Sequence, residues 1–132
     1  MGKYAKILLV DDDDDLRDLL QTVLRSNCHS VVGAPDCSTA IQLLKSQDFD
    51  VVLLDITLPD AKGFEVARFL QENHLPAKVI VITATAGLEN AIRSAALGVK
   101  DYITKPFTTN YLLRCIDNAL SMEYPTQGLQ LS

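Results

Sequence analysis

The chain has no long apolar run, no cluster of basic residues and only three cysteines among its 132 residues. A membrane-spanning helix needs roughly 18 or more consecutive apolar residues. Neither such a run nor the apolar segment of a secretory signal peptide is found. Contacts to nucleic-acid phosphates need clustered Lys and Arg, so the net charge of -5 argues against direct nucleic-acid binding. These absences predict a domain that binds neither membranes nor nucleic acids.

The cysteines form neither an even disulfide set nor a CxxC metal-binding pair; they are Cys28, Cys37 and Cys115. We therefore expect reduced and mostly packed thiols, which suits the cytoplasm. The length and the hydrophobic fraction of 48% fit one globular domain with a single sizeable core. We place this domain at residues 1–122 and interpret residues 123–132 as a C-terminal tail or the start of a linker.

Five short apolar runs alternate with segments of helical spacing. The runs predict strands over 6–10, 30–34, 50–54, 78–83 and 100–103. Three of these runs are apolar at consecutive positions, as expected for strands covered on both faces of a parallel sheet. The clearest helical stripes are Leu16, Leu19, Leu20, Val23 and Leu24, and Leu112, Cys115, Ile116, Ala119 and Leu120; weaker ones are Ala40, Leu43 and Leu44, then Phe64, Ala67 and Leu70, then Leu88, Ala91, Ile92 and Ala95. The alternation predicts a doubly wound, flavodoxin-like α/β fold with a five-stranded parallel sheet flanked by five helices.

Five consecutive aspartates, 11–15, follow the first predicted strand. Adjacent like charges repel, and a carboxylate at the edge of an apolar core loses hydration. Asp13, Asp14 and Asp15 lie close to the start of the next predicted helix, where negative side chains favour the helix dipole and cap the chain. Asp11 and Asp12 remain as candidate ligands of a cation.

Functional side chains of open α/β sheets gather at the carboxyl ends of the strands. The candidates there are Asp11 and Asp12 after the first strand, Asp55 after the third, Thr83 at the end of the fourth, and Lys105 past the fifth. Singly, each is compatible with a cap, a turn or a solvated loop, but together they favour a site. Three carboxylates gathered there call for a proton or a cation, and Mg²⁺ accepts carboxylates while keeping positions for water and phosphate. This set supplies the nucleophile, the metal and the donors that phosphoryl transfer requires.

Four segments resemble the receiver domain of bacterial two-component response regulators: ILLVDDD, DVVLLDITLPDAKGFEV, VIVITATA and KDYITKPF. The resemblance covers about residues 3–122 and implies a receiver-type fold. By this resemblance Asp55 is the phosphoacceptor, and Asp11 and Asp12 are the acidic pair that binds Mg²⁺. It also implies that the Thr83 hydroxyl acts as a switch and that Lys105 contacts the phosphoryl group.

The resemblance implies further roles around this site. The backbone carbonyl of Thr57 would be a metal ligand, and the positions of Thr57 and Thr85 are associated with the lifetime of the phosphoryl group. A cis peptide is expected before Pro106, and Tyr102 matches the aromatic switch position. Gly63 would serve the start of the third helix.

The resemblance also implies partners. A sensor histidine kinase or a histidine phosphotransfer protein would supply the phosphoryl group, and the chain would catalyse its own phosphorylation and dephosphorylation without being an enzyme in the ordinary sense. Phosphorylation would change the surface formed by the predicted fourth helix, fifth strand and fifth helix. That surface would serve an output domain or a homodimer, in a cytoplasmic protein.

Two other functions stay open from the residues alone. The first aspartates also fit a phosphatase of the haloacid dehalogenase type, with Asp11 as nucleophile and Asp13 as acid/base. Such enzymes need further acidic metal ligands after the lysine, where this chain offers only Asp117, and Asp55 would have no role. A receiver-like module that binds partners without phosphorylation would usually have lost an acid or the lysine, and none is lost here.

Overall fold

The computed structural model describes residues 4–56, 64–84, 87 and 97–121. These residues contain the strands β1 (Lys6–Val10), β2 (Ser30–Ala34), β3 (Val51–Ile56), β4 (Lys78–Thr83) and β5 (Asp101–Thr104), and the helices α1 (Asp14–Ser26), α2 (Cys37–Ser46), α3 (Glu65–Glu72) and α5 (Thr109–Ser121). The strands form one parallel sheet in the order β2-β1-β3-β4-β5. The predicted parallel α/β fold is confirmed. The helix predicted around Leu88 to Ala95 lies outside the described residues.

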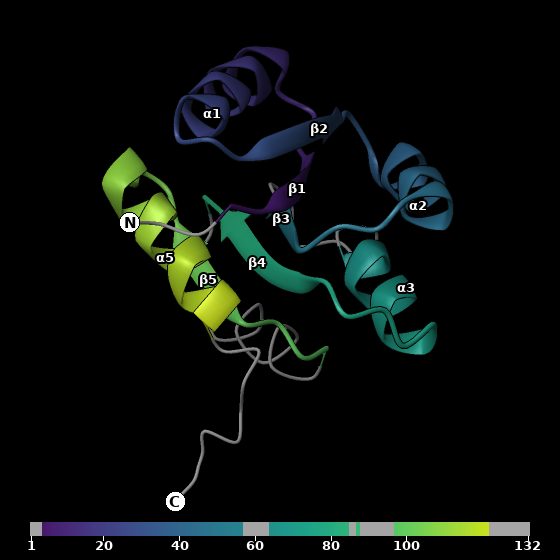
Figure 1. The fold of residues 1–132 in the computed structure, drawn as a ribbon. Helices are drawn as coiled ribbons and strands as arrows, with labels where there is room; N and C mark the ends of the chain where they lie inside the picture. Colours follow the sequence, from purple (N-terminus) through teal and green to yellow (C-terminus); the bar gives the residue numbers. More distant parts are fainter. Residues whose placement is uncertain (1–3, 57–63, 85–86, 88–96, 122–132) are drawn as a thin grey trace, which may run out of the picture.

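The sheet separates two apolar cores. Alternate strand residues point to opposite faces, so Ile7 and Leu9 of β1 face one core while Leu8 faces the other. We call these the α1/α5 core and the α2/α3 core, after the helices that cover each face (Figure 1). Because both faces are covered, the central strands are apolar at consecutive positions and fully buried, as their sequences predict.

The predicted strand bounds hold for β1, β2 and β4, whereas the other two strands are displaced. β3 was expected over 50–54 but runs from Val51 to Ile56, because Asp55 and Ile56 continue the ladder opposite Ile82 and Thr83 of β4. β5 was expected over 100–103 and is shifted by one residue, to Asp101–Thr104. A polar residue within β3 therefore interrupts the apolar pattern without ending the strand.

Among the described residues, the helical stripes mark the buried or half-buried faces with one exception. All five stripe residues of α5 are buried, as are Leu20 and Leu24 of α1. Leu19 of α1 is 56% exposed, because α1 lies along the β2 edge of the sheet and buries a narrower stripe than its apolar residues suggest (Figure 1).

All three cysteines are free thiols, but Cys28 is exposed, so the expectation of mostly packed thiols is wrong at this position.

No helix within the described ranges has both the length and the apolar character needed to cross a bilayer. The predicted tail at 123–132 lies outside the described residues, as do Thr57, Gly63 and Thr85.

Candidate functional site

The parallel register brings the predicted site residues to one edge of the sheet. Val10, the last residue of β1, pairs with Leu54, so Asp11 follows at the level of Asp55 in β3. Thr83 closes β4, and its carbonyl accepts a hydrogen bond from the backbone N–H of Lys105 at 2.8 Å. The carboxyl ends of β1, β3, β4 and β5 therefore meet as predicted.

A short ion pair lies at the centre of this edge. Lys105 Nζ is 2.6 Å from Asp55 Oδ2, and the Asp55 side chain is only 2% exposed. The peptide between Lys105 and Pro106 is cis, as the resemblance predicts. Lys105 is thus anchored to β4 through its backbone and to β3 through its ammonium group.

Asp11 is the second buried carboxylate of the site, with 2% of its surface exposed. Its Oδ1 accepts a hydrogen bond from the N–H of Asp13 at 2.9 Å. Its Oδ2, like Oδ1 of Asp55, is buried without a hydrogen-bond partner among the described residues. Buried carboxylate oxygens without partners are costly in free energy, so this pair of atoms favours a further proton or cation.

The electrostatics of the two carboxylates point in the same direction. Burial raises the pKa of Asp11 to about 6, and the nearby charge of Asp55 adds to the increase, while the N–H of Asp13 and the Lys105 ammonium oppose it. Burial also raises the pKa of Asp55, against the opposing hydrogen bond and charge of Lys105. Two carboxylates therefore share a single ammonium group, and a divalent cation would neutralise the excess negative charge.

Asp12 is exposed at the rim of this edge, close enough that its charge contributes to the raised pKa of Asp55. Within the described ranges, no group of three or more His, Cys, Asp or Glu side chains is arranged to hold a metal. The buried part of the site is thus the pair Asp11 and Asp55. A pair is sufficient for Mg²⁺, which usually takes one or two carboxylates and retains several waters.

The two predicted switch residues lie beside this pair. Thr83 is 1% exposed and lies opposite Ile56 of β3 and Thr104 of β5. Tyr102 of β5 is half-buried against the α2/α3 core, and its backbone N–H donates to Asp101 Oδ1 at 2.8 Å. The predicted ligand Thr57 and the predicted lifetime position Thr85 lie outside the described residues.

Arg17 also belongs to this edge, although no motif of the sequence marks it as a site residue. Arg17 Nη1 donates a hydrogen bond of 2.7 Å to the backbone carbonyl of Asp11. The only signal in the sequence is a basic residue two positions after the acidic run, one helical turn from Asp14 within it.

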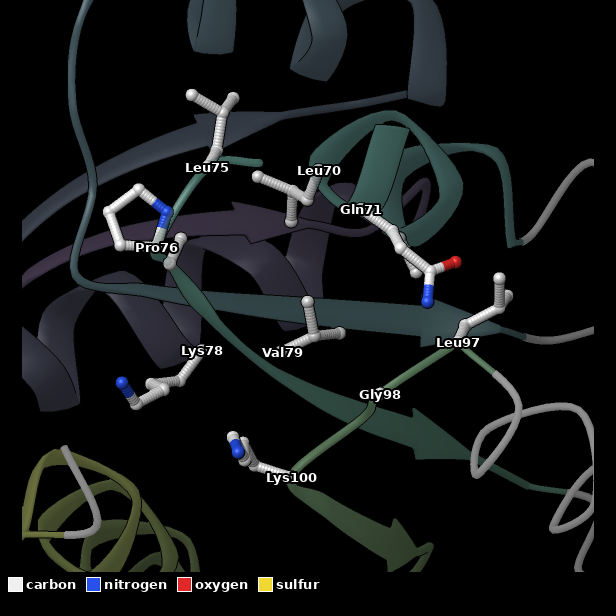
Figure 2. A pocket seen from close by; sticks show the side chains of 11 residues that line it. Leu70, Gln71, Leu75, Pro76, Lys78, Val79, Leu97, Gly98 and Lys100 are labelled. Carbon is white, nitrogen blue, oxygen red and sulfur yellow. The ribbon is translucent and has the colours of Figure 1, made fainter. Parts of the chain in front are cut away.

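A depression of about 320 Å³ lies at the opposite edge of the sheet. Figure 2 shows it between the end of α3, the start of β4 and the turn before β5, with Leu70, Val79 and Leu97 around it and Lys100 at one side. None of the predicted site residues lines it, so it contributes nothing to the chemistry of the carboxyl edge.

Comparison with known proteins agrees with this arrangement. The family described as the response regulator receiver domain matches residues 7–117. The chain belongs to this family. Receivers are signalling switches rather than enzymes in the ordinary sense, they generally bind Mg²⁺ in their phosphorylation site, and they typically interact with histidine kinases or phosphotransfer proteins.

Individual receivers show the same likeness. The cell cycle response regulator CtrA of Brucella ovis is 32% identical over 108 residues, which are 82% of this chain and 47% of the relative. A CheY-like receiver domain protein from Methanospirillum hungatei is 30% identical with a TM-score of 0.84, over 96% of this chain and all of that one. NtrX from Brucella abortus is 28% identical with a TM-score of 0.83, over 95% of this chain and 29% of that one. This receiver spans about half the length of the curated relatives it matches.

Proposed function

We propose that this receiver is a phosphoacceptor switch in which Asp55 takes a phosphoryl group from a histidine kinase or a histidine phosphotransfer protein. The observation that carries this proposal is the buried Asp55 carboxylate, held 2.6 Å from the Lys105 ammonium beside the second buried acid, Asp11. This arrangement combines a nucleophile with a donor for the charge of a transferred group.

In the proposed reaction, a carboxylate oxygen of Asp55 attacks the phosphorus of a phosphohistidine. The P–N bond breaks, its electron pair returns to the imidazole nitrogen, and an acyl phosphate forms. Lys105 is placed to pair with the phosphoryl oxygens during the transfer. Water later attacks the phosphorus, which releases inorganic phosphate and restores the carboxylate.

Mg²⁺ is the cofactor that fits this site. Asp11 Oδ2 and Asp55 Oδ1 are the buried oxygens that would hold it, with the exposed Asp12 as a further ligand, direct or through water. We also assign the Thr57 carbonyl to this ligand set, and a role in phosphoryl lifetime to Thr57 and Thr85, on the resemblance alone. When bound, Mg²⁺ would neutralise the acids and stabilise the negative charge of the transferred group.

The phosphatase alternative is not favoured. It needs Asp13 as acid/base, but Asp13 caps α1, with its Oδ1 accepting a hydrogen bond of 3.1 Å from the N–H of Leu16. It also leaves unexplained the ion pair between Asp55 and Lys105. The same intact pair argues against a receiver that has lost phosphorylation.

The output of the switch is a further part of the proposal. We assign the response to Thr83 and Tyr102 and to the surface formed by the predicted fourth helix, β5 and α5, which would contact an output domain or a second copy of the chain. A cytoplasmic location follows from the proposed kinase partners.

The test is labelling with acetyl phosphate in Mg²⁺, followed by mass spectrometry of the intact protein. Asp55→Asn is nearly isosteric and should abolish the mass increase of one phosphoryl group, because the amide forms no acyl phosphate. The matched control Asp48→Asn makes the same charge change at an exposed position before β3 and should label like the parent. Full labelling of Asp55→Asn would exclude Asp55, and loss of labelling only in Asp11→Asn would favour the phosphatase.

A further inference from the structure

The carbonyl of Asp11 lies just beyond the end of β1, at the start of the acidic run. The Asp11 N–H still donates to the Ala34 carbonyl of β2 at 3.0 Å, so the β1–β2 pairing reaches this residue. The Asp11 carbonyl then accepts from Arg17 Nη1 at 2.7 Å. A charge-assisted hydrogen bond of this length is stronger than one between neutral groups.

Arg17 holds two points of the turn at once. Its Nη2 is 2.6 Å from Asp14 Oδ1 in the first turn of α1, while Nη1 contacts the Asp11 carbonyl. Its backbone N–H donates to the Asp13 carbonyl at 2.9 Å. A planar guanidinium with both ends engaged fixes direction as well as distance, which a lysine ammonium does not.

The peptide that Arg17 holds is the one between Asp11 and Asp12. Because a peptide unit is planar, fixing its carbonyl oxygen restricts the ψ angle of Asp11 and the φ angle of Asp12. These two angles set how the two carboxylates lie relative to each other. Arg17 contacts neither the Asp11 nor the Asp12 carboxylate, so its guanidinium takes up none of the oxygens that could bind a cation.

Gly33 makes room for this contact. A Cβ atom at Gly33 in β2 would lie 3.1 Å from Arg17 Cδ and 2.0 Å from Gln21 Nε2. Any larger residue would displace these side chains of α1 from the face of β2. The side chain of Arg17 is only 17% exposed, in agreement with a covered path toward the Asp11 carbonyl.

We propose that Arg17 is a positioning residue of the metal site. It orients the Asp11–Asp12 peptide through the Asp11 carbonyl and thereby sets the geometry in which the Asp11 and Asp12 carboxylates bind Mg²⁺. This inference rests on the proposed function of the site. It predicts that losing the guanidinium weakens Mg²⁺ binding although no metal-binding oxygen is removed. Groups that orient metal ligands commonly change metal affinity by roughly 10- to 100-fold.

The experiment compares Arg17→Met, Arg17→Lys and Arg25→Met by calorimetric titration of Mg²⁺ into the metal-free chain without a phosphodonor. Arg25 is a matched control, because it lies on the same helix and donates to the Val31 carbonyl of β2 at 3.1 Å, at the other end of the strand. Arg17→Met should raise the Kd for Mg²⁺ about tenfold. Arg17→Lys, which keeps the charge without the fork, should give an intermediate Kd, and Arg25→Met should stay within about twofold of the parent.

A second readout separates positioning from general damage. In acetyl phosphate labelling, Arg17→Met should need about tenfold more Mg²⁺ for half-maximal rate, with nearly the parental rate at saturating Mg²⁺. Thermal melting of each variant establishes that it is folded; if Arg17→Met does not fold, Arg17→Lys and Gly33→Ala take its place, each with an expected increase in Kd.

Three results would overturn the inference: a parental Kd in Arg17→Met, a parental Kd in Arg17→Lys, or equal increases in Arg17→Met and Arg25→Met. A parental Kd in Arg17→Lys would show that the guanidinium fork is not needed. Equal increases would show a general disturbance of α1, because the loss of a positive charge alone should strengthen the binding of a cation. Failure of the parent to become labelled at Asp55 would instead remove the proposed function, while the Mg²⁺ titrations would still decide the role of Arg17.

Discussion

At the scale of single residues, the site is a balance between two buried acids and one ammonium group. Asp11 and Asp55 both lose hydration, and Lys105 compensates mainly for Asp55 through its 2.6 Å contact. The proton affinity of Asp11 is therefore higher in the folded chain than in the unfolded chain. Such a difference in pKa makes the stability of the fold depend on pH.

The sign of this dependence is the reverse of that for a salt-bridged aspartate. The pKa of Asp11 rises from 3.8 to about 6 on folding. The favourable contribution of Asp11 to the free energy of unfolding is therefore complete below about pH 4 and is lost as the pH rises through about 6. In Asp11→Asn this loss disappears, so without Mg²⁺ the variant should be more stable than the parent at pH 7, by about 3 kcal/mol, and gain little at pH 4.

Thermal melting in EDTA from pH 4 to 7.5 measures this difference. Taking the difference between variant and parent removes the contribution of His29, whose pKa is lowered by burial and which acts in the opposite sense. Asp48→Asn is again the exposed control. The prediction would be contradicted if the Tm values of Asp11→Asn and the parent differed by the same amount at every pH in this range.

At the scale of elements, the start of α1 explains most of the aspartate run. Asp13 is the N-cap, and Asp14 and Asp15 lie in the first turn, where negative side chains interact favourably with the positive end of the helix dipole. This division was predictable, because caps and first turns have local sequence preferences. The part played by Arg17 was not, since it depends on a carbonyl six residues earlier and on the space above Gly33 in another strand.

The strand that we expect the proposed switch to change most is β5. Thr83 and Tyr102 lie on neighbouring strands, with Tyr102 opposite Val81, two residues before Thr83. A phosphoryl group on Asp55 would draw the Thr83 hydroxyl toward its oxygens and leave space for Tyr102 to turn inward. The switch then consists of a shift between two arrangements that the phosphoryl group favours unequally.

Amide chemical shifts test this movement in the described part of the surface. With beryllofluoride and Mg²⁺ bound as a phosphoryl mimic, shifts should change in β5 and α5 of the parent, and much less in Thr83→Ala. Thr104→Ala is the matched control, because it removes the same hydroxyl from the paired and exposed position in β5. Equal changes in Thr83→Ala and parent would remove Thr83 from the switch, and a Tyr102 without shift changes would be only a strand aromatic.

At the scale of the whole molecule, the sheet and its functional edge could be predicted from the sequence. Consecutive apolar residues indicate doubly covered strands, and parallel strands bring their carboxyl ends together, so Asp11, Asp55 and Lys105 were expected to meet. The exact end of β3 and the exposure of Leu19 could not be predicted. Both depend on which neighbour an element packs against, and a local pattern does not contain that information.

The division of the interior into an α1/α5 core and an α2/α3 core has a consequence for thermodynamic coupling. Leu8 and Leu9 are joined by a peptide bond yet lie in different cores, whereas Leu9 and Leu53 share the α1/α5 core as register partners in adjacent strands. Leu→Val at each position should cost about 1 kcal/mol. In double-mutant cycles by urea unfolding, the pair at Leu8 and Leu9 should add within about 0.5 kcal/mol, while the pair at Leu9 and Leu53 should deviate by more. Equal coupling energies in both cycles would mean that the two cores respond to a mutation as a single core. Additivity of the Leu8 and Leu9 mutations would mean that two residues joined by a peptide bond are energetically independent when the sheet separates their side chains.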